Sequence, residues 1–230
     1  MEGLEKTYKV VDLKKSYGEL KVLDGINIEF KSGKVTAILG PSGSGKTTMF
    51  NILMDNIEDF SGEIIGFKDC SISSIFQEHR LIQWKSVYEN IEFVLKDKIQ
   101  KENLKGIIDK YLNLVGLKDY IDYYPKSLSG GMKQRVNIAR AFAYPSEVLL
   151  MDEPFKSLDI RTKNDIYNLF RELMVNSKRA VILITHDIDE AVALGDTIVI
   201  FSDKPTKIKA VIENKKGHES NVKKQIENIM

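Results

Sequence analysis

The 230-residue sequence has few of the features that mark secreted, disulfide-stapled or membrane-spanning chains. Its single cysteine excludes an intramolecular disulfide and a cysteine-rich zinc site, and is typical of a reducing compartment. No apolar run approaches the ~20 residues of a membrane-spanning helix, since core-like stretches such as AVILIT at 180–185 have the length of a strand. The N-terminal residues contain no apolar signal core. These absences predict a soluble intracellular protein.

The sequence also lacks an excess of charge of either sign. Its 34 Lys and Arg residues nearly balance 33 Asp and Glu residues, which leaves a formal net charge of +1. Dedicated nucleic-acid-binding proteins usually carry a strongly basic face, so we expect no nucleic-acid partner. The remaining composition, 43% hydrophobic and 29% charged, is that of a globular chain long enough to bury a sizeable core.

What the sequence does contain is an alternation of short apolar strands and helical patterns. Residues 35–39, 148–151 and 180–185 have the pattern of buried strands, and helix-compatible stretches follow them. Residues 26–30 alternate apolar with polar, which indicates a half-buried strand. This order predicts an α/β fold with a mainly parallel sheet covered on both faces by helices.

The middle and the end of the chain read as helical. Apolar residues at helical spacing between 104 and 115 lie on one face, and residues 130–143 also read as helix. We therefore expect a helical subdomain at about 86–143 within a single domain that spans 1–230. The basic tail predicts a helix at about 218–230, which is either docked with a solvated face or in contact with a membrane surface or partner.

A phosphate-binding motif follows the strand at 35–39. Residues 40–47, GPSGSGKT, match G-x-x-x-x-G-K-[ST] between a buried strand and a helix, as this motif requires. Its glycines let backbone N–H groups surround phosphate oxygens, and the helix N-terminus adds its dipole. We expect Lys46 to reach the β- and γ-phosphates and the Thr47 hydroxyl to bind Mg²⁺. The expected nucleotide-binding residues are Gly40, Pro41, Ser42, Gly43, Ser44, Gly45, Lys46, Thr47 and Thr48.

Two carboxylates and a histidine end neighbouring predicted strands. Ligands of open α/β sheets bind at the carboxyl ends of the strands, where Asp152, Glu153 and His186 are expected. Asp152 suits Mg²⁺ coordination, and Glu153 is placed to act as a general base on an attacking water. His186 is placed to contact the γ-phosphate. His79 and His218 have no such placement.

Residues 128–135, LSGGMKQR, resemble the signature of ATP-binding-cassette (ABC) proteins. Further motifs occur in the family's order. Tyr17 in SYG resembles the aromatic residue that stacks on adenine, Gln77 the Q-loop glutamine, residues 157–159 the D-loop and His186 the switch histidine. The resemblance implies an ATPase with ATP and Mg²⁺ as cofactors. It also implies a P-loop NTPase core of the ABC ATPase type, with an N-terminal antiparallel β part and a helical subdomain.

The resemblance implies partners as well. Ser129 is a natural helix N-cap, and Gly130 and Gly131 expose backbone N–H groups, which makes a second anion site. In the family, a head-to-tail dimer places each ATP between the P-loop of one subunit and Ser129, Gly130 and Gly131 of the other. The resemblance further implies that Gln77 contacts Mg²⁺ and the site of the attacking water. It also implies that the segment 76–95 contacts integral membrane permease subunits. We therefore expect a peripheral location on the cytoplasmic face of the cell membrane, and an indirect link to an extracytoplasmic solute-binding protein.

Residues 76–91 and 185–202 most resemble ATPases that drive import of nitrate, sulfonates, taurine and related solutes, including thiamine precursors. The sequence departs from them at Lys156, where their D-loop region has glycine, and at His79, which replaces a common proline. Trp84 either lies at the contact with the membrane subunits or is partly buried.

Other functions remain as alternatives. An ABC ATPase of a lipoprotein-export or cell-division complex is the main one. A nucleotide-gated module without turnover is disfavoured by the presence of both Glu153 and His186, and a GTPase by the absence of an N-K-x-D motif.

Overall fold

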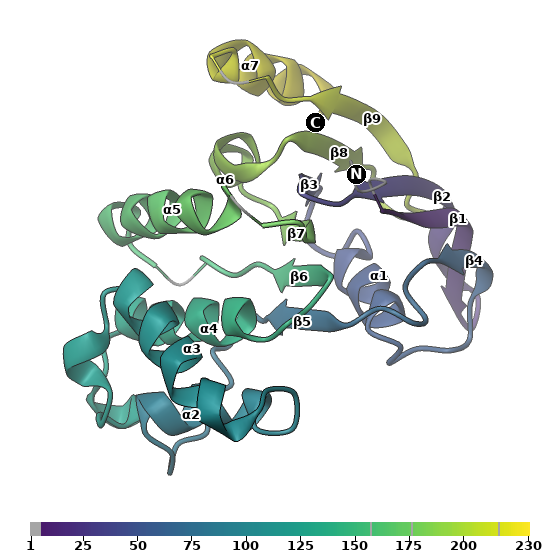
Figure 1. Ribbon diagram of the computed structural model, residues 1–230. Coiled ribbons are helices and arrows are strands. Elements are labelled where there is room, and N and C mark those ends of the chain that lie inside the picture. Colours follow the sequence, from purple (N-terminus) through teal and green to yellow (C-terminus); the bar gives the residue numbers. More distant parts are fainter. Residues whose placement is uncertain (1–5, 157, 176, 216) are drawn as a thin grey trace, which may run out of the picture. The chain divides into compact units, whose positions relative to one another are not determined.

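The computed structural model describes residues 6–156, 158–175, 177–215 and 217–230 (Figure 1). The chain divides into two compact units. The first contains the residues up to Ile72, Glu147–Glu153 and the residues from Lys178 onward, and the second contains Ser73–Ser146 and Pro154–Ser177. In the ranges that the structure describes, no helix combines the length and apolar character needed to cross a bilayer.

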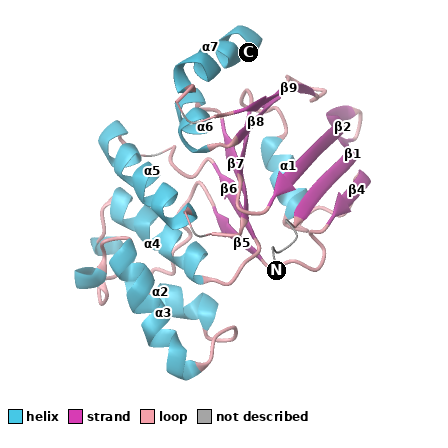
Figure 2. Ribbon diagram, turned by 45° about the horizontal axis from the view of Figure 1, so that its top comes forward, coloured by secondary structure: helices cyan, strands magenta, loops and turns pink. Residues whose placement is uncertain are grey.

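The first unit contains an antiparallel sheet at its N-terminal end (Figure 2). Its strands are β1 (Thr7–Tyr17), β2 (Leu20–Lys31) and β4 (Ser61–Ile65), in the order β2-β1-β4. A tight turn joins β1 to β2, and Gly18 adopts φ 58° there, a left-handed conformation that two-residue hairpin turns require. The antiparallel β part implied by the family resemblance is therefore confirmed.

The second sheet contains the buried strands of the prediction. Its order is β5-β6-β7-β3-β8-β9. The strands are β5 (Ile72–Ile75), β6 (Val148–Asp152), β7 (Ala180–Thr185), β3 (Val35–Leu39), β8 (Thr197–Phe201) and β9 (Ile208–Glu213). β6, β7, β3 and β8 run parallel, and every residue of β3 and β7 is buried, as expected for strands covered on both faces. β9 pairs antiparallel with β8 at the edge, a strand that the sequence pattern does not reveal.

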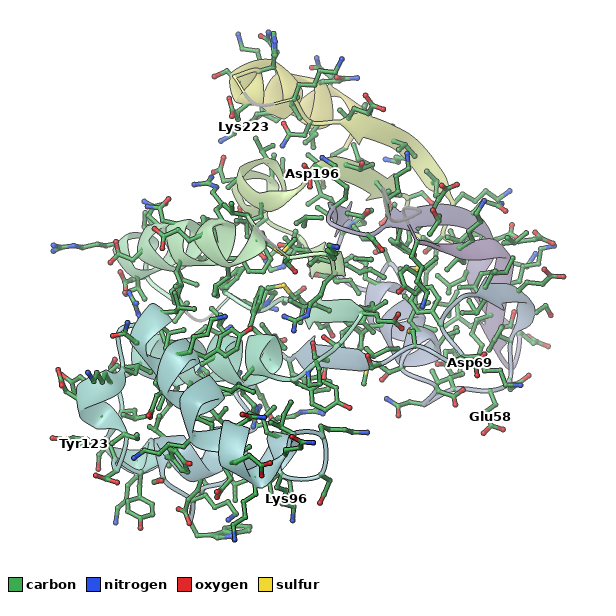
Figure 3. The ribbon with its side chains drawn as sticks, viewed as in Figure 1. Glu58, Asp69, Lys96, Tyr123, Asp196 and Lys223 are labelled. Atoms are coloured by element: carbon green, nitrogen blue, oxygen red, sulfur yellow. The ribbon has the colours of Figure 1, made fainter. Side chains whose placement is uncertain are left out.

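Three helices complete the first unit: α1 (Lys46–Leu53), α6 (Ile188–Leu194) and α7 (Glu219–Ile229). α1 packs against β6 and β7, between the two sheets in Figure 2. α7 packs on α6 and buries Val222 and Ile226, while Lys223, labelled in Figure 3, donates to Asp189. Of the two readings of the basic tail, the structure favours a docked helix with a solvated face.

The second unit is mainly helical. Its helices are α2 (Val87–Leu95), α3 (Lys101–Leu114), α4 (Gly130–Ala143) and α5 (Ile160–Met174), with short 3₁₀ helices η1 (Lys118–Tyr120) and η2 (Pro125–Ser127). Ser86 and Glu89 form a capping box at the start of α2. Leu104, Ile108 and Leu112 of α3 are buried, as their spacing predicts. The unit is larger than the helical segment 86–143 expected from the sequence, since it also contains residues 73–85 and α5.

Candidate nucleotide-binding site

Three strands of the first unit end at the same edge of the larger sheet. In the parallel ladders, Leu39 of β3 lies opposite Thr185 of β7, and Asp152 of β6 lies opposite Ile184. The P-loop at 40–47 follows β3, Glu153 follows β6 and His186 follows β7. These are the residues for which the sequence predicts nucleotide binding and catalysis. The sheet therefore brings a phosphate-binding loop, two carboxylates and an imidazole to one edge, where α/β folds bind their ligands.

Close packing holds the backbone of the P-loop in place. Gly43 and Gly45 adopt φ values of 81° and 87°, which other residues rarely adopt. A Cβ atom at Gly45 would lie 2.8 Å from Cγ1 of Val22 on β2, and one at Gly40 would lie 2.9 Å from Cβ of Phe201 on β8. Both separations are too short for a real Cβ, so the glycines let β2 and β8 approach the loop and fix its course.

Hydrogen bonds to backbone carbonyls complete the P-loop. Lys46 is 5% exposed, and its Nζ donates to the carbonyl oxygens of Gly40 at 2.7 Å and Pro41 at 2.8 Å. Thr206, fully buried between β8 and β9, donates its hydroxyl to the carbonyl oxygen of Ser44. Sequence reasoning missed Thr206, because nothing in the pattern connects a lone threonine with a loop 162 positions away.

Glu153 and His186 face each other at the sheet edge. Nδ1 of His186 lies 3.0 Å from Oε1 of Glu153, and the side chains are 41% and 14% exposed, respectively. The backbone N–H of Glu153 donates to the carbonyl of Ile184 at 2.9 Å, and Glu153 adopts φ 43°. A non-glycine residue in this region is strained, and such residues cluster at functional sites. The geometry suits a carboxylate that accepts a proton from water beside an imidazole that orients it.

Two residues of this unit carry side-chain oxygen atoms that could hold a magnesium ion. Thr47 is an exposed residue in the first turn of α1, and Asp152 is the last residue of β6. Mg²⁺ typically takes one or two protein oxygens together with substrate phosphates and water. An all-protein cage is not required, and the described residues contain no cluster of three or more His, Cys, Asp or Glu side chains suited to one. Gln77 is an exposed residue of the second unit, and its role as a ligand stays a prediction.

The candidate adenine platform lies at the end of β1. Tyr17 is 49% exposed, which leaves part of its ring open to a ligand. Nζ of Lys15 lies 4.8 Å from the centroid of this ring, within the range of a cation–π interaction. Lys15 stands two positions before Tyr17 on β1 and was not predicted from the sequence.

The signature motif begins a helix of the second unit. Ser129 is the N-cap of α4 and accepts a hydrogen bond from the N–H of Met132 at 3.3 Å, which confirms the predicted cap. Ser129 and Gly130 are exposed, and a Cβ at Gly130 would meet no atom within 4 Å. A Cβ at Gly131 would lie 2.8 Å from Cγ2 of Thr162 on α5. The N-terminus of α4 is thus an open surface, backed by a close contact with α5.

Part of the candidate D-loop caps α5. Asp159 accepts hydrogen bonds from the N–H and the hydroxyl of Thr162, at 3.0 and 2.6 Å, and these bonds lower the pKa of Asp159. Ser157 lies outside the described residues, and Lys156 is exposed. Thr162 therefore contacts both the candidate D-loop and the signature helix, a role that sequence reasoning missed.

The segment after Gln77 is tied to α4. Arg140 donates to the carbonyl oxygens of His79 and Arg80, at 3.1 and 2.9 Å. Burial and the nearby Lys133 lower the pKa of His79. Trp84 is 79% exposed, so the alternative of partial burial is wrong. The side chain of Tyr123, labelled in Figure 3, is also exposed on this unit.

Comparisons with known proteins identify the family of the chain. The model of the ABC transporter family matches residues 23–156. The chain is 43% identical to the aliphatic sulfonates import ATP-binding protein SsuB of Bacillus cereus over 209 residues, 87% of this chain and 82% of that protein. It is 36% identical to an ABC transporter ATP-binding protein of Methanocaldococcus jannaschii over 201 residues, 84% of this chain and 75% of that protein.

Solved structures show the same fold. The structure of cbiO1 from Clostridium perfringens, part of the ABC transporter complex cbiONQ, aligns with a TM-score of 0.81 at 28% identity and covers 95% of this chain and 92% of its own. The dimeric structure of a bacterial ABC transporter cassette aligns with a TM-score of 0.76 at 29% identity. The alignment covers 90% of this chain and 99% of the cassette. This chain therefore belongs to the ABC transporter family and has the fold of its ATP-binding cassettes.

Proposed function

We propose that this chain is the ATP-hydrolysing subunit of an ABC importer that takes up a small organic or inorganic solute. The observation that carries the ATPase assignment is the contact of 3.0 Å between Glu153 and His186 at the edge where the P-loop begins. Relatives named as aliphatic sulfonates import ATP-binding proteins support import, and favour it over lipoprotein export or cell division. Within this class, the solute is of the nitrate, sulfonate, taurine or thiamine-precursor type.

The first unit supplies the binding and acid–base groups. Tyr17 stacks on adenine, while the backbone of residues 41–48, whose N–H donors begin at Ser42, and the ammonium of Lys46 hold the phosphates. Glu153 accepts the proton of the attacking water, and His186 orients this water and contacts the γ-phosphate. Little covalent chemistry falls to the protein in phosphoryl transfer, so positioning and charge stabilisation supply most of the rate.

Thr47 and Asp152 are the residues of the first unit that would hold Mg²⁺, and Gln77 is proposed as a further ligand. Bound there, the ion would offset the charge of the phosphates. The exposed hydroxyl of Thr47 and the carboxylate at the end of β6 supply the hard oxygen ligands that this ion prefers.

A second copy of the chain completes each ATP site. We propose a head-to-tail dimer, in which Ser129, Gly130 and Gly131 of one subunit contact the ATP on the P-loop of the other. The open N-terminus of α4 supports this arrangement, because Ser129 and Gly130 are exposed and backbone N–H groups at a helix N-terminus suit an anion. ATP binding would then close the dimer and hydrolysis would release it, since ATP itself forms part of the interface.

The membrane partners contact the second unit. We propose that integral permease subunits bind the segment 76–95, and the exposure of Trp84 supports this site. The protein would then be peripheral to the cytoplasmic face of the membrane and would act on an extracytoplasmic solute-binding protein only through the permease. In this proposal residues 1–230 form one ABC ATPase domain, with the second unit as its helical subdomain.

The substitution Glu153→Gln tests the ATPase proposal. It removes the proton acceptor but keeps the shape of the side chain, so phosphate release should fall by about 10²–10⁴-fold. ATP binding should persist, and size-exclusion chromatography with saturating ATP should show a dimer. Glu147→Gln is the control, because Glu147 lies in the same strand-bearing segment but pairs with Lys6 at 2.6 Å. A Glu153→Gln protein that stays monomeric at saturating ATP would refute the sandwich dimer.

A further inference from the structure

Lys15 is a buried cation beneath the candidate adenine platform. Its side chain is 5% exposed, and its Nζ lies 4.8 Å from the ring centroid of Tyr17. Because Lys15 is buried while Tyr17 is 49% exposed, the ammonium covers the inner side of the ring and leaves an outer part open. The positive charge of Lys15 therefore contacts the face of the Tyr17 ring that is turned toward the protein interior.

Asp59 holds this ammonium in place. Nζ of Lys15 donates to the backbone carbonyl of Asp59 and to its Oδ2, the latter at 3.0 Å. The Asp59 side chain itself is 99% exposed and lies in the loop between α1 and β4, next to Glu58, which is labelled in Figure 3. A buried ammonium is costly unless it is paired, so these two bonds confine its position. The result is a fixed contact between the strand β1 and the loop that follows the P-loop helix.

We propose that Lys15 is a positioning residue for adenine: it fixes the ring of Tyr17 in the stacking orientation through the contact between its ammonium and the inner face of the ring. This inference rests on the proposed stacking role of Tyr17. A free tyrosine at the end of a strand would lose side-chain freedom when a base stacks on it, and ordering such a side chain weakens binding. Lys15 orders the ring before ATP arrives. It contacts no phosphate and takes no part in the reaction.

The proposal predicts a change in ATP affinity without a change in chemistry. Lys15→Met keeps the apolar stem and removes the charge, so the dissociation constant for ATP should rise about fivefold, the size of one cation–π contact. The kcat at saturating ATP should stay unchanged, because Lys46, Glu153 and His186 are untouched. Lys15→Arg should restore most of the affinity, since a guanidinium also interacts with aromatic faces. Lys14→Met is the matched control, because Lys14 pairs with Asp12 at 2.7 Å.

A double-mutant cycle separates this role from a merely structural one. Tyr17→Ala alone should raise the ATP dissociation constant about five- to a hundredfold, the range found for loss of one base-stacking aromatic side chain. In that background, Lys15→Met should have no further effect. Equal effects of Lys15→Met in both backgrounds would show that Lys15 acts on the fold and not through the ring, and would overturn the proposal.

The same measurements distinguish this inference from the function on which it rests. An unchanged ATP affinity in Tyr17→Ala would refute the adenine platform itself. A weakened affinity in Tyr17→Ala together with normal affinity in Lys15→Met would refute only the role of Lys15. Thermal unfolding checks that the variants fold, and Asp59→Ala, which loosens the ammonium, provides the same comparison if Lys15→Met does not fold.

Discussion

The N-termini of α1 and α4 carry the same kind of chemistry in different surroundings. Both helices begin with glycine-rich sequence whose backbone N–H groups suit an anion. At α1 the loop is enclosed, since Val22, Phe201 and Thr206 pack against it and Lys46 adds a cation. At α4 the side chain of Ser129 caps the helix, and Gly130 faces open space.

This contrast indicates that the P-loop is better suited than the N-terminus of α4 to bind phosphate without a partner. The P-loop is pre-organised by the core of the first unit, so its donors need no rearrangement when a phosphate binds. At the terminus of α4, Thr162 of α5 lies close behind Gly131 but Gly130 faces open space among the described residues, and a helix dipole on an exposed surface is weak. In the proposed dimer, the P-loop would bind the ATP of its own subunit and the N-terminus of α4 would contact the ATP held by the other subunit.

The largest effect that would test this contrast comes from Ser129→Arg. A long charged side chain at the cap of α4 blocks the open terminus, so ATP turnover should fall about a hundredfold or more, as for loss of a transition-state contact. ATP binding to the isolated monomer, measured by calorimetry, should be unchanged because the P-loop is untouched. Ser127→Arg is the control, since it adds the same charge to the neighbouring 3₁₀ helix η2. Loss of monomer binding in Ser129→Arg would mean that the proposed contact between α4 and the ATP of the other subunit is wrong.

Two glycine-to-alanine substitutions, one at each helix N-terminus, should change the free energy of unfolding by different amounts. Gly45→Ala forces a Cβ to within 2.8 Å of Val22 at φ 87°, so we expect a loss of about 1–3 kcal/mol in the free energy of unfolding and loss of ATP binding. Gly130→Ala meets open space, so the free energy of unfolding should change by less than about 0.5 kcal/mol. Urea unfolding measures both. Equal destabilisation would contradict the claim that one loop is enclosed and the other open.

The smallest effect concerns the buried hydroxyl of Thr206. Thr206→Val keeps the shape but removes the donor to the Ser44 carbonyl, so the ATP dissociation constant should rise about two- to tenfold. Thr206→Ser keeps the hydroxyl and should bind ATP nearly as the parent does. Isothermal titration provides the measurement. Normal ATP binding by Thr206→Val would show that the hydrogen bond to Ser44 is not needed to hold the loop.

Most of the first unit's site follows from local sequence. The P-loop, the acid pair after β6 and His186 after β7 could each be predicted, because each ends a recognisable apolar strand and parallel strands place their ends on one edge. The signature cap at Ser129 was predictable from its residue type, since Ser is a preferred N-cap. The edge strand β9 escaped prediction, because its alternation is short and its neighbour lies antiparallel.

The residues that hold these groups in place were not predictable. Lys15, Thr162 and Thr206 act through contacts with residues that the sequence pattern does not link to them, and each is a common residue type in an ordinary local context. Trp84 was undecided, because a lone aromatic residue fits a core as well as a surface. Its exposure in the folded chain excludes partial burial, and its contact with membrane subunits stays a prediction.

The family and the α/β order could be read from the sequence, because both depend on residue types at short, regular spacing, and the same spacing predicts the chemistry of the nucleotide site. The tertiary structure alone decided the orientation of Glu153 toward His186, the enclosure of the P-loop by β2 and β8, and the burial of Lys15 beneath Tyr17. The physical reason is that packing and hydrogen bonds join residues by distance in space, whereas a motif records only distance along the chain.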